Sequence, residues 1–162
     1  MKTIQNVVIF LALCVFSLTT NAQKKLMHEA NNHIMVMPKD IKWTEGPLAL
    51  PAGAKKVILE GDPKDSGLFT LRFLLPAGYK IMPHRHTAAE HITVIQGTFY
   101  MGVGEKFDEK ALTAIPTSGF AVMSTGTPHY GLAKQECIIQ IHGVGPWVVN
   151  YVNPKDDPRK KK

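Results

Sequence analysis

The residues best able to do chemistry lie close together in the middle of the chain. His84 and His86 are two positions apart, so in an extended strand their imidazoles leave from the same face. Glu90 follows four residues after His86, and a short turn at residues 87–89 would return its carboxylate to that face. Two imidazoles and a carboxylate that meet at one point are ligands for a divalent transition metal. The alternative is a surface strand with two solvated histidines, and spacing alone leaves both open.

The elements that must position these side chains are predicted to be β-strands. Short runs rich in Val, Ile, Phe and Thr alternate with Gly and Pro turns, and no long 3.6-residue apolar period follows Gln23. We predict strands over residues 56–60, 68–75, 79–84, 90–96, 98–103, 112–115, 119–123, 137–142 and 147–152. Short strands at this spacing indicate an all-β sandwich or a closed barrel.

Glycines frame the histidine segment and extend its pattern. The series Gly-x5-His-x-His-x3-Glu-x6-Gly is met by Gly78, His84, His86, Glu90 and Gly97. It resembles the first motif of the cupin superfamily, and Gly126 and His129 downstream fit the Gly-x-x-His of the second. Ser124 and Ala133 depart from that second motif, where the superfamily usually has Pro and often has Asn. These two positions shape turns and do not ligate a metal.

The resemblance implies a fold and a cofactor. It implies a single-domain cupin jelly-roll β-barrel over residues 55–152, similar to the small exported single-domain cupins of bacteria. One divalent transition metal (Fe, Mn, Ni, Co or Zn) is then expected inside the barrel, held by His84, His86, Glu90 and His129. The set lacks a thiolate, so nothing favours Zn over the others. A homodimer is also implied, because dimers are frequent in the superfamily.

The two ends of the chain differ from its middle. Residues 1–22 have the order of a secretory signal peptide, with Lys2, an apolar run over residues 7–18 and small residues before Gln23. We therefore expect an exported protein, periplasmic or secreted, without a membrane anchor because the run is too short. Residues 23–54 are expected to wrap the outside of the barrel. Residues 153–162 are expected to form a basic polar tail in solvent, whose removal after Pro154 changes the melting temperature little.

Composition argues against several classes of protein. The 162 residues carry a formal net charge of +6, but five of the positive charges belong to Lys2 and residues 159–162, so the chain between them is nearly neutral. A nucleic-acid partner is not expected, because a basic reading face is normally spread over the folded domain. Cleavage before Gln23 leaves Cys137, which cannot form an internal disulfide and is expected to be a buried strand residue.

Four further polar residues interrupt the predicted strands. His91 has the opposite strand parity to Glu90 and is expected to point away from the metal. Arg72 is expected on the outside because its apolar neighbours fill the core, whereas an inward Arg72 would bind a substrate carboxylate. Gln140 and His142 could line a polar cavity or face solvent. The alternation of side chains along the strand does not decide between these two placements.

Three functions are compatible with these patterns. The first is a metalloenzyme, an oxygenase, isomerase or lyase, that acts on a small anionic (carboxylate or enolisable) or aromatic substrate with the metal as Lewis acid or O₂ site. The second is a non-catalytic module that binds a small ligand or a metal. The third is a structural or sensor domain whose metal supports folding. We favour the enzyme because the ligand set is complete and the protein is expected to be exported, although the fold itself does not choose. Three neutral imidazoles and one carboxylate leave a divalent centre positive, which favours an anionic substrate.

Overall fold

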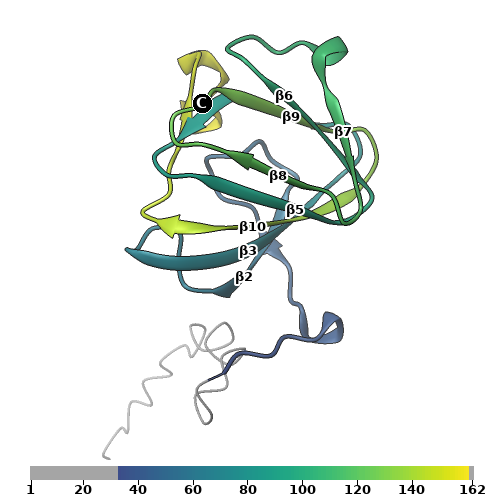
Figure 1. Cartoon of the computed structure of the whole chain (residues 1–162), viewed down its shortest axis with the longest axis vertical. Helices are drawn as coiled ribbons and strands as arrows, with labels where there is room; N and C mark the ends of the chain where they lie inside the picture. The colour runs from purple at the N-terminus through teal and green to yellow at the C-terminus, as the bar shows by residue number, and fades with distance from the viewer. Residues whose placement is uncertain (1–32, 161–162) are drawn as a thin grey trace, which may run out of the picture. The chain divides into compact units, whose positions relative to one another are not determined.

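The strands of the chain form two antiparallel sheets (Figure 1). The computed structural model describes residues 33–160, and the predicted signal peptide lies outside the described residues. The chain divides into two compact units, Met1–Met35 and Val36–Lys162, and both sheets belong to the second. The first sheet contains, in spatial order, β1 (Thr44–Glu45), β2 (Lys55–Glu60), β3 (Gly67–Leu75), β10 (Cys137–Gly145), β5 (Glu90–Gln96) and β8 (Phe120–Met123). The second contains β11 (Val149–Tyr151), β4 (Tyr79–His86), β9 (His129–Ala133), β6 (Thr98–Val103) and β7 (Thr113–Pro116).

An apolar core fills the space between the two sheets. Alternate residues of β3 and β10 face it, because side chains of a strand alternate between faces. The core includes Phe69, Leu71, Phe73, Leu75, Ile92, Val94, Phe99, Met101, Ile139 and Ile141. Burying one such side chain contributes about 1.5–3 kcal/mol. The all-β jelly-roll prediction is confirmed.

Cys137 belongs to this core, as the sequence predicts. Its side chain is fully buried at the start of β10. Burial first, and then the charge of Glu136, raises the pKa of the Cys137 thiol to about 11. The residue is therefore an uncharged apolar packing group at neutral pH.

In the first sheet, the strand residues that alternate with the core-facing residues point away from the core. Some of these residues form polar pairs between neighbouring strands. The Nε of Arg72 donates a hydrogen bond to Oε1 of Gln140 at 2.9 Å, across paired positions of β3 and β10. His91 and His142 are paired across β5 and β10, and their rings stack with centroids 4.8 Å apart. The outward placement of Arg72 and His91 is confirmed. Gln140 and His142 also lie on this face, so they do not line a polar cavity in the barrel.

Strand β9 is absent from the strands predicted by sequence. All five of its residues are buried. In the sequence, Gly131 suggests a break between strands. In the structure it lets the ring of Phe99 approach the backbone of β9 closely, since a Cβ on Gly131 would lie 2.4 Å from Cζ of Phe99. Gly102 of β6 has the same role, because a Cβ there would lie 2.3 Å from Cζ of Tyr130. These glycines therefore make room for aromatic rings within the second sheet.

The segment after β11 is folded, which corrects the expectation of a tail free in solvent. It forms two short 3₁₀ turns, η4 (Pro154–Asp156) and η5 (Pro158–Lys160). Asp157 between them is only 6% exposed, and it accepts two side-chain hydrogen bonds from Arg159 at 2.8 and 2.9 Å. The Nη2 of Arg159 also donates to the carbonyl of Val149 at 3.0 Å. Polar contacts therefore hold the segment on β11. A prediction based only on the lack of apolar residues in this segment misses these contacts.

Within the part of the chain that the structure describes, two other 3₁₀ turns lie outside the strands, η2 (Pro38–Asp40) and η3 (Glu109–Ala111). Within residues 33–160, a helix with the length and apolar character to cross a membrane is not found. Part of the predicted wrapping segment joins the first sheet, because β1 pairs with β2.

Candidate metal centre

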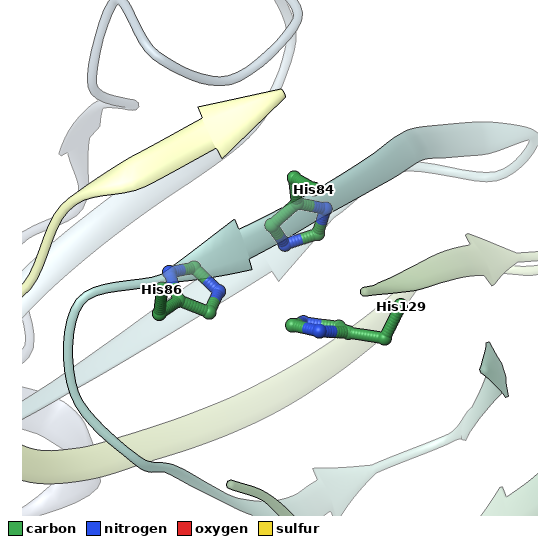
Figure 2. A group of neighbouring side chains, drawn as sticks. All are labelled: His84, His86 and His129. Carbon is green, nitrogen blue, oxygen red and sulfur yellow. The ribbon is translucent and has the colours of Figure 1, made fainter. Parts of the chain in front are cut away.

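Three histidines converge in the interior between the sheets (Figure 2). His84 and His86 lie on β4, two residues apart, so their rings leave from the same face. His129 begins β9 and is paired with His84 across the two strands. One ring nitrogen from each of the three lies within 4.8 Å of the others, and all three side chains are buried. The structure therefore brings together histidines that lie far apart in sequence.

The ring orientation of each histidine is set by the backbone. In every case Nδ1 faces a backbone carbonyl: Met82 at 2.8 Å from His84, Val148 at 3.2 Å from His86, and Thr127 at 2.9 Å from His129. A carbonyl only accepts, so each Nδ1 carries the proton and donates it. Nε2 is then the nitrogen of each ring that remains to bind a metal. This is the arrangement that orients histidines toward a metal ion.

Glu90 lies beside two of these nitrogens. It is the first residue of β5, and 4% of its surface is exposed. Its carboxylate oxygens lie 3.0 Å from Nε2 of His129 and 3.6 Å from Nε2 of His86. Oε2 of Glu90 and both Nε2 atoms are buried without a hydrogen-bond partner. Lone pairs at such distances repel one another unless a proton or a metal cation lies between them.

The protonation of the three rings follows from their surroundings. Burial first, and then the charge of His129, lowers the pKa of His84 to about 3. Burial and then the charges of His84 and His129 lower the pKa of His86 to about 2. Burial also lowers the pKa of His129, but Glu90 and the carbonyl of Thr127 outweigh it, and the net shift is upward. Two imidazoles are thus uncharged and ready to ligate, whereas the upward shift favours a proton on His129, which a metal must displace.

The donor set fits a divalent transition metal. Buried lone pairs without hydrogen-bond partners need a cation, and imidazole with carboxylate is a mixture that such metals accept. The three histidines would hold the ion. The group of ligand atoms within 4.8 Å of one another consists of the three histidines and does not include Glu90. The role of Glu90 as fourth ligand therefore stays a prediction.

The histidines open into a cavity between the sheets. The cavity encloses about 470 Å³, its open mouth included. Most of its wall is apolar; the lining residues are Pro47, Leu50, Phe73, Ile81, His84, His86, Glu90, Ile92, Phe99, Met101, His129, Tyr130, Gly131, Ile139, Ile141, Trp147 and Val149. Glu90 is the one acidic side chain among these, and the lining includes no Lys or Arg. Such a wall favours a small ligand with little polar surface away from the histidines.

Sequence reasoning missed Trp147 as part of this site. Its ring stacks on that of His86, with centroids 3.9 Å apart and planes at 15°. Tyr130 was also missed; it lines the cavity, and its hydroxyl donates to the carbonyl of Asp108 at 3.2 Å. No local spacing signals these contacts, because each aromatic residue meets the site only through the pairing of distant strands.

Comparison with known proteins identifies the family. The model of the ChrR cupin-like domain matches residues 31–115, which is just over half of the chain. The chain belongs to this cupin family. The cupin resemblance seen in the histidine motifs is thereby confirmed. No curated protein matches the chain.

Solved cupins and their relatives share the fold. The polyketide cyclase RemF from Streptomyces resistomycificus is 18% identical with a TM-score of 0.63, and the match covers 79% of this chain and 91% of that one. An acetylacetone dioxygenase from Acinetobacter johnsonii is 19% identical with a TM-score of 0.58, covering 81% and 84%. An RmlC-like cupin from Shewanella frigidimarina NCIMB 400 is 11% identical with a TM-score of 0.52, covering 67% and 87%. At these identities the likeness establishes the fold alone.

Proposed function

We propose that this cupin is a metal-dependent enzyme that acts on a small, largely apolar molecule bearing a carboxylate or enolate oxygen. The observation that carries the proposal is that three buried imidazoles aim their Nε2 atoms at one position on the wall of an apolar cavity. A divalent metal bound there supplies Lewis acidity or a site for O₂. With the Glu90 carboxylate, simple charge counting leaves that centre at about +1, which favours an anionic oxygen.

The chain's own residues contribute positioning and proton transfer. The backbone carbonyls that hold the three Nδ1 protons keep the rings in place before any ligand enters. Glu90 is the cavity's acidic side chain, and its oxygens can accept the proton that an enolisable substrate loses. The apolar walls exclude water and so strengthen electrostatic interactions at the centre.

Glu90 has two roles to test, fourth ligand or proton acceptor. Glu90→Gln keeps the shape of the side chain and an oxygen near His129, but it removes the carboxylate's charge and basicity. Loss of turnover with full metal content indicates a proton acceptor. Loss of metal together with turnover indicates a ligand.

The first experiment is elemental analysis of the protein after expression in metal-supplemented medium. We expect one transition metal per wild-type chain, and a large loss in His86→Ala and His129→Ala. His142→Ala is the matched control, because it removes a half-buried imidazole from the outer face of the first sheet and should leave the metal content unchanged. A wild type without metal, or retention of full occupancy in both site variants, contradicts the site and the enzyme proposal with it.

Turnover is tested separately on metal-loaded protein. We would screen small carboxylates, aromatic diols and enolisable carbonyl compounds, with and without O₂, following O₂ uptake and product formation. Acetylacetone is included because one structural neighbour is named an acetylacetone dioxygenase. Metal binding without turnover of any compound supports instead the non-catalytic binding or sensor module.

We further propose that the enzyme acts after export, in the periplasm or outside the cell. The proposal rests on the signal-peptide pattern of residues 1–22 alone. The intact mass of secreted protein tests it, and a chain that begins at Gln23 is expected.

A further inference from the structure

Trp147 is held against the metal centre from several sides. Its ring stacks on His86, and the ring of Phe69 lies 5.7 Å away at 50°. Its backbone N–H donates to the carbonyl of Pro63 at 2.7 Å. Thr87 clamps the neighbouring backbone, since its hydroxyl donates to the carbonyl of residue 146 at 2.9 Å and accepts from the N–H of residue 148 at 3.1 Å. The indole therefore has a fixed position in the cavity wall.

The indole N–H of Trp147 has no hydrogen-bond partner among residues 33–160. Its Nε1 atom is buried and makes no hydrogen bond. An indole nitrogen can only donate, and a buried donor left unpaired is costly. Trp147 is one of the residues that line the cavity, so an oxygen of a molecule bound there would supply the missing acceptor.

The other polar side chains of the cavity wall cannot donate to a ligand. The three histidines give their Nδ1 protons to backbone carbonyls, and their Nε2 atoms, once bound to the metal, carry no proton to donate. Glu90 as a carboxylate only accepts, and the hydroxyl of Tyr130 donates to Asp108. Among the described residues that line the cavity, Trp147 is thus the side chain with an uncommitted donor.

We propose that Trp147 is the residue that selects the ligand, by donating from Nε1 to an oxygen of the molecule bound at the three histidines. The inference rests on the proposed function, since it takes one ligand oxygen to be held at that centre. The ligand class that fits has two oxygens, as in a carboxylate or the enolate of a dicarbonyl compound, on an apolar body. The wall contains no further uncommitted donor for the hydroxyls of a sugar or for a second carboxylate.

Trp147→Phe tests this role, because phenylalanine keeps an aromatic ring on His86 and removes the N–H. The probes are isobutyrate, which has two acceptor oxygens, and imidazole, which binds a metal through nitrogen and presents an N–H. Both are titrated into Co²⁺-loaded protein, with the visible absorption of the cobalt as readout. Trp43→Phe is the matched control, since it makes the same change at a tryptophan that does not line the cavity.

We expect Trp147→Phe to weaken isobutyrate binding about tenfold or more, the effect of losing one hydrogen bond to a charged group. Its affinity for imidazole and its cobalt content should equal those of the wild type, and Trp43→Phe should change neither affinity. Unchanged isobutyrate affinity, or equal weakening of both probes, overturns the proposal.

A second measurement uses the wild type and does not depend on how the variant folds. The chain has two tryptophans, Trp43 and Trp147, and Trp43 is absent from the cavity lining. In Zn²⁺-loaded protein, isobutyrate should move the indole ¹H–¹⁵N resonance of Trp147 downfield and slow its hydrogen exchange. The resonance of Trp43 serves as the internal reference. A Trp147 resonance that does not respond to bound isobutyrate contradicts the hydrogen bond.

The outcomes separate this inference from the function on which it rests. Protein that takes up no metal defeats the proposed function. Protein that takes up cobalt and binds imidazole, yet shows no isobutyrate preference dependent on Trp147, retains the metal centre and defeats the inference alone.

Discussion

Asp157 and Arg159 show what a single charged pair does for the end of the chain. The hydrogen bonds of Arg159, ahead of all other effects, hold the pKa of the Asp157 carboxyl below its ordinary value of 3.8. The unfolded chain therefore takes up a proton at Asp157 more readily than the folded chain. The pair's contribution to stability is present above the ordinary pKa and is lost as the pH falls through the lower pKa of the folded state.

We predict that Arg159→Ala lowers the melting temperature of metal-free protein by a few degrees at pH 6, because it frees the segment from the carbonyl of Val149. The difference between wild type and variant should shrink as the pH falls below 3.8. Thermal denaturation followed by circular dichroism over this range checks both. Lys155→Ala is the control, because the Lys155 side chain has no such contact among the described residues. A difference that persists unchanged in acid contradicts the assignment to this pair.

At the scale of the element, β9 depends on glycine at position 131, where the neighbouring strand β6 presents the ring of Phe99. A Cβ on Gly131 would lie 2.4 Å from the ring of Phe99, which is itself buried, so neither group has room to yield. We predict that Gly131→Ala lowers the free energy of unfolding by about 1–3 kcal/mol, the usual cost of overpacking. Urea denaturation measures the effect.

The control for β9 is the double variant with Phe99→Leu, which shortens the ring that Gly131 faces. Gly131→Ala should cost less in the Phe99→Leu background than in the wild type, because the clash is then relieved. Equal costs in both backgrounds would show that the loss comes from another source.

At the scale of the whole molecule, the centre joins the two sheets. The three histidines lie on β4 and β9 of the second sheet, whereas Glu90 begins β5 of the first. A metal bound by all four would therefore link the layers that enclose the core. Binding to the folded state alone stabilises it by mass action.

We predict that metal raises the free energy of unfolding by about 2.7 kcal/mol when its free concentration is 100 times its Kd. Calorimetry with and without added metal measures the change. His86→Ala should abolish it, and His91→Ala, on the outer face, should retain it. If Glu90 ligates, Glu90→Ala reduces the effect; an undiminished increase in that variant would show that the histidines suffice. The homodimer implied by the cupin resemblance stays a prediction for sedimentation analysis.

Much of this arrangement is determined locally and can therefore be predicted from the sequence. Strands β5 and β6 have the predicted bounds, because alternation of side chains within a few residues decides which face is buried. The same geometry places His84 and His86 on one face. The Gly-x-x-His motif adds His129 by resemblance, and parity puts Arg72 and His91 outside.

Other features arise only when distant strands meet. The glycine at 131 looks like a break until the ring of Phe99 from β6 is packed against it. Trp147 reaches His86 because β11 pairs with β4, and Arg159 finds a carbonyl on β11. Covalent geometry fixes the spacing of neighbours, but register between strands far apart in the chain depends on the packing of the whole core. The tertiary structure alone therefore decided that Trp147 lies against His86 in the cavity wall.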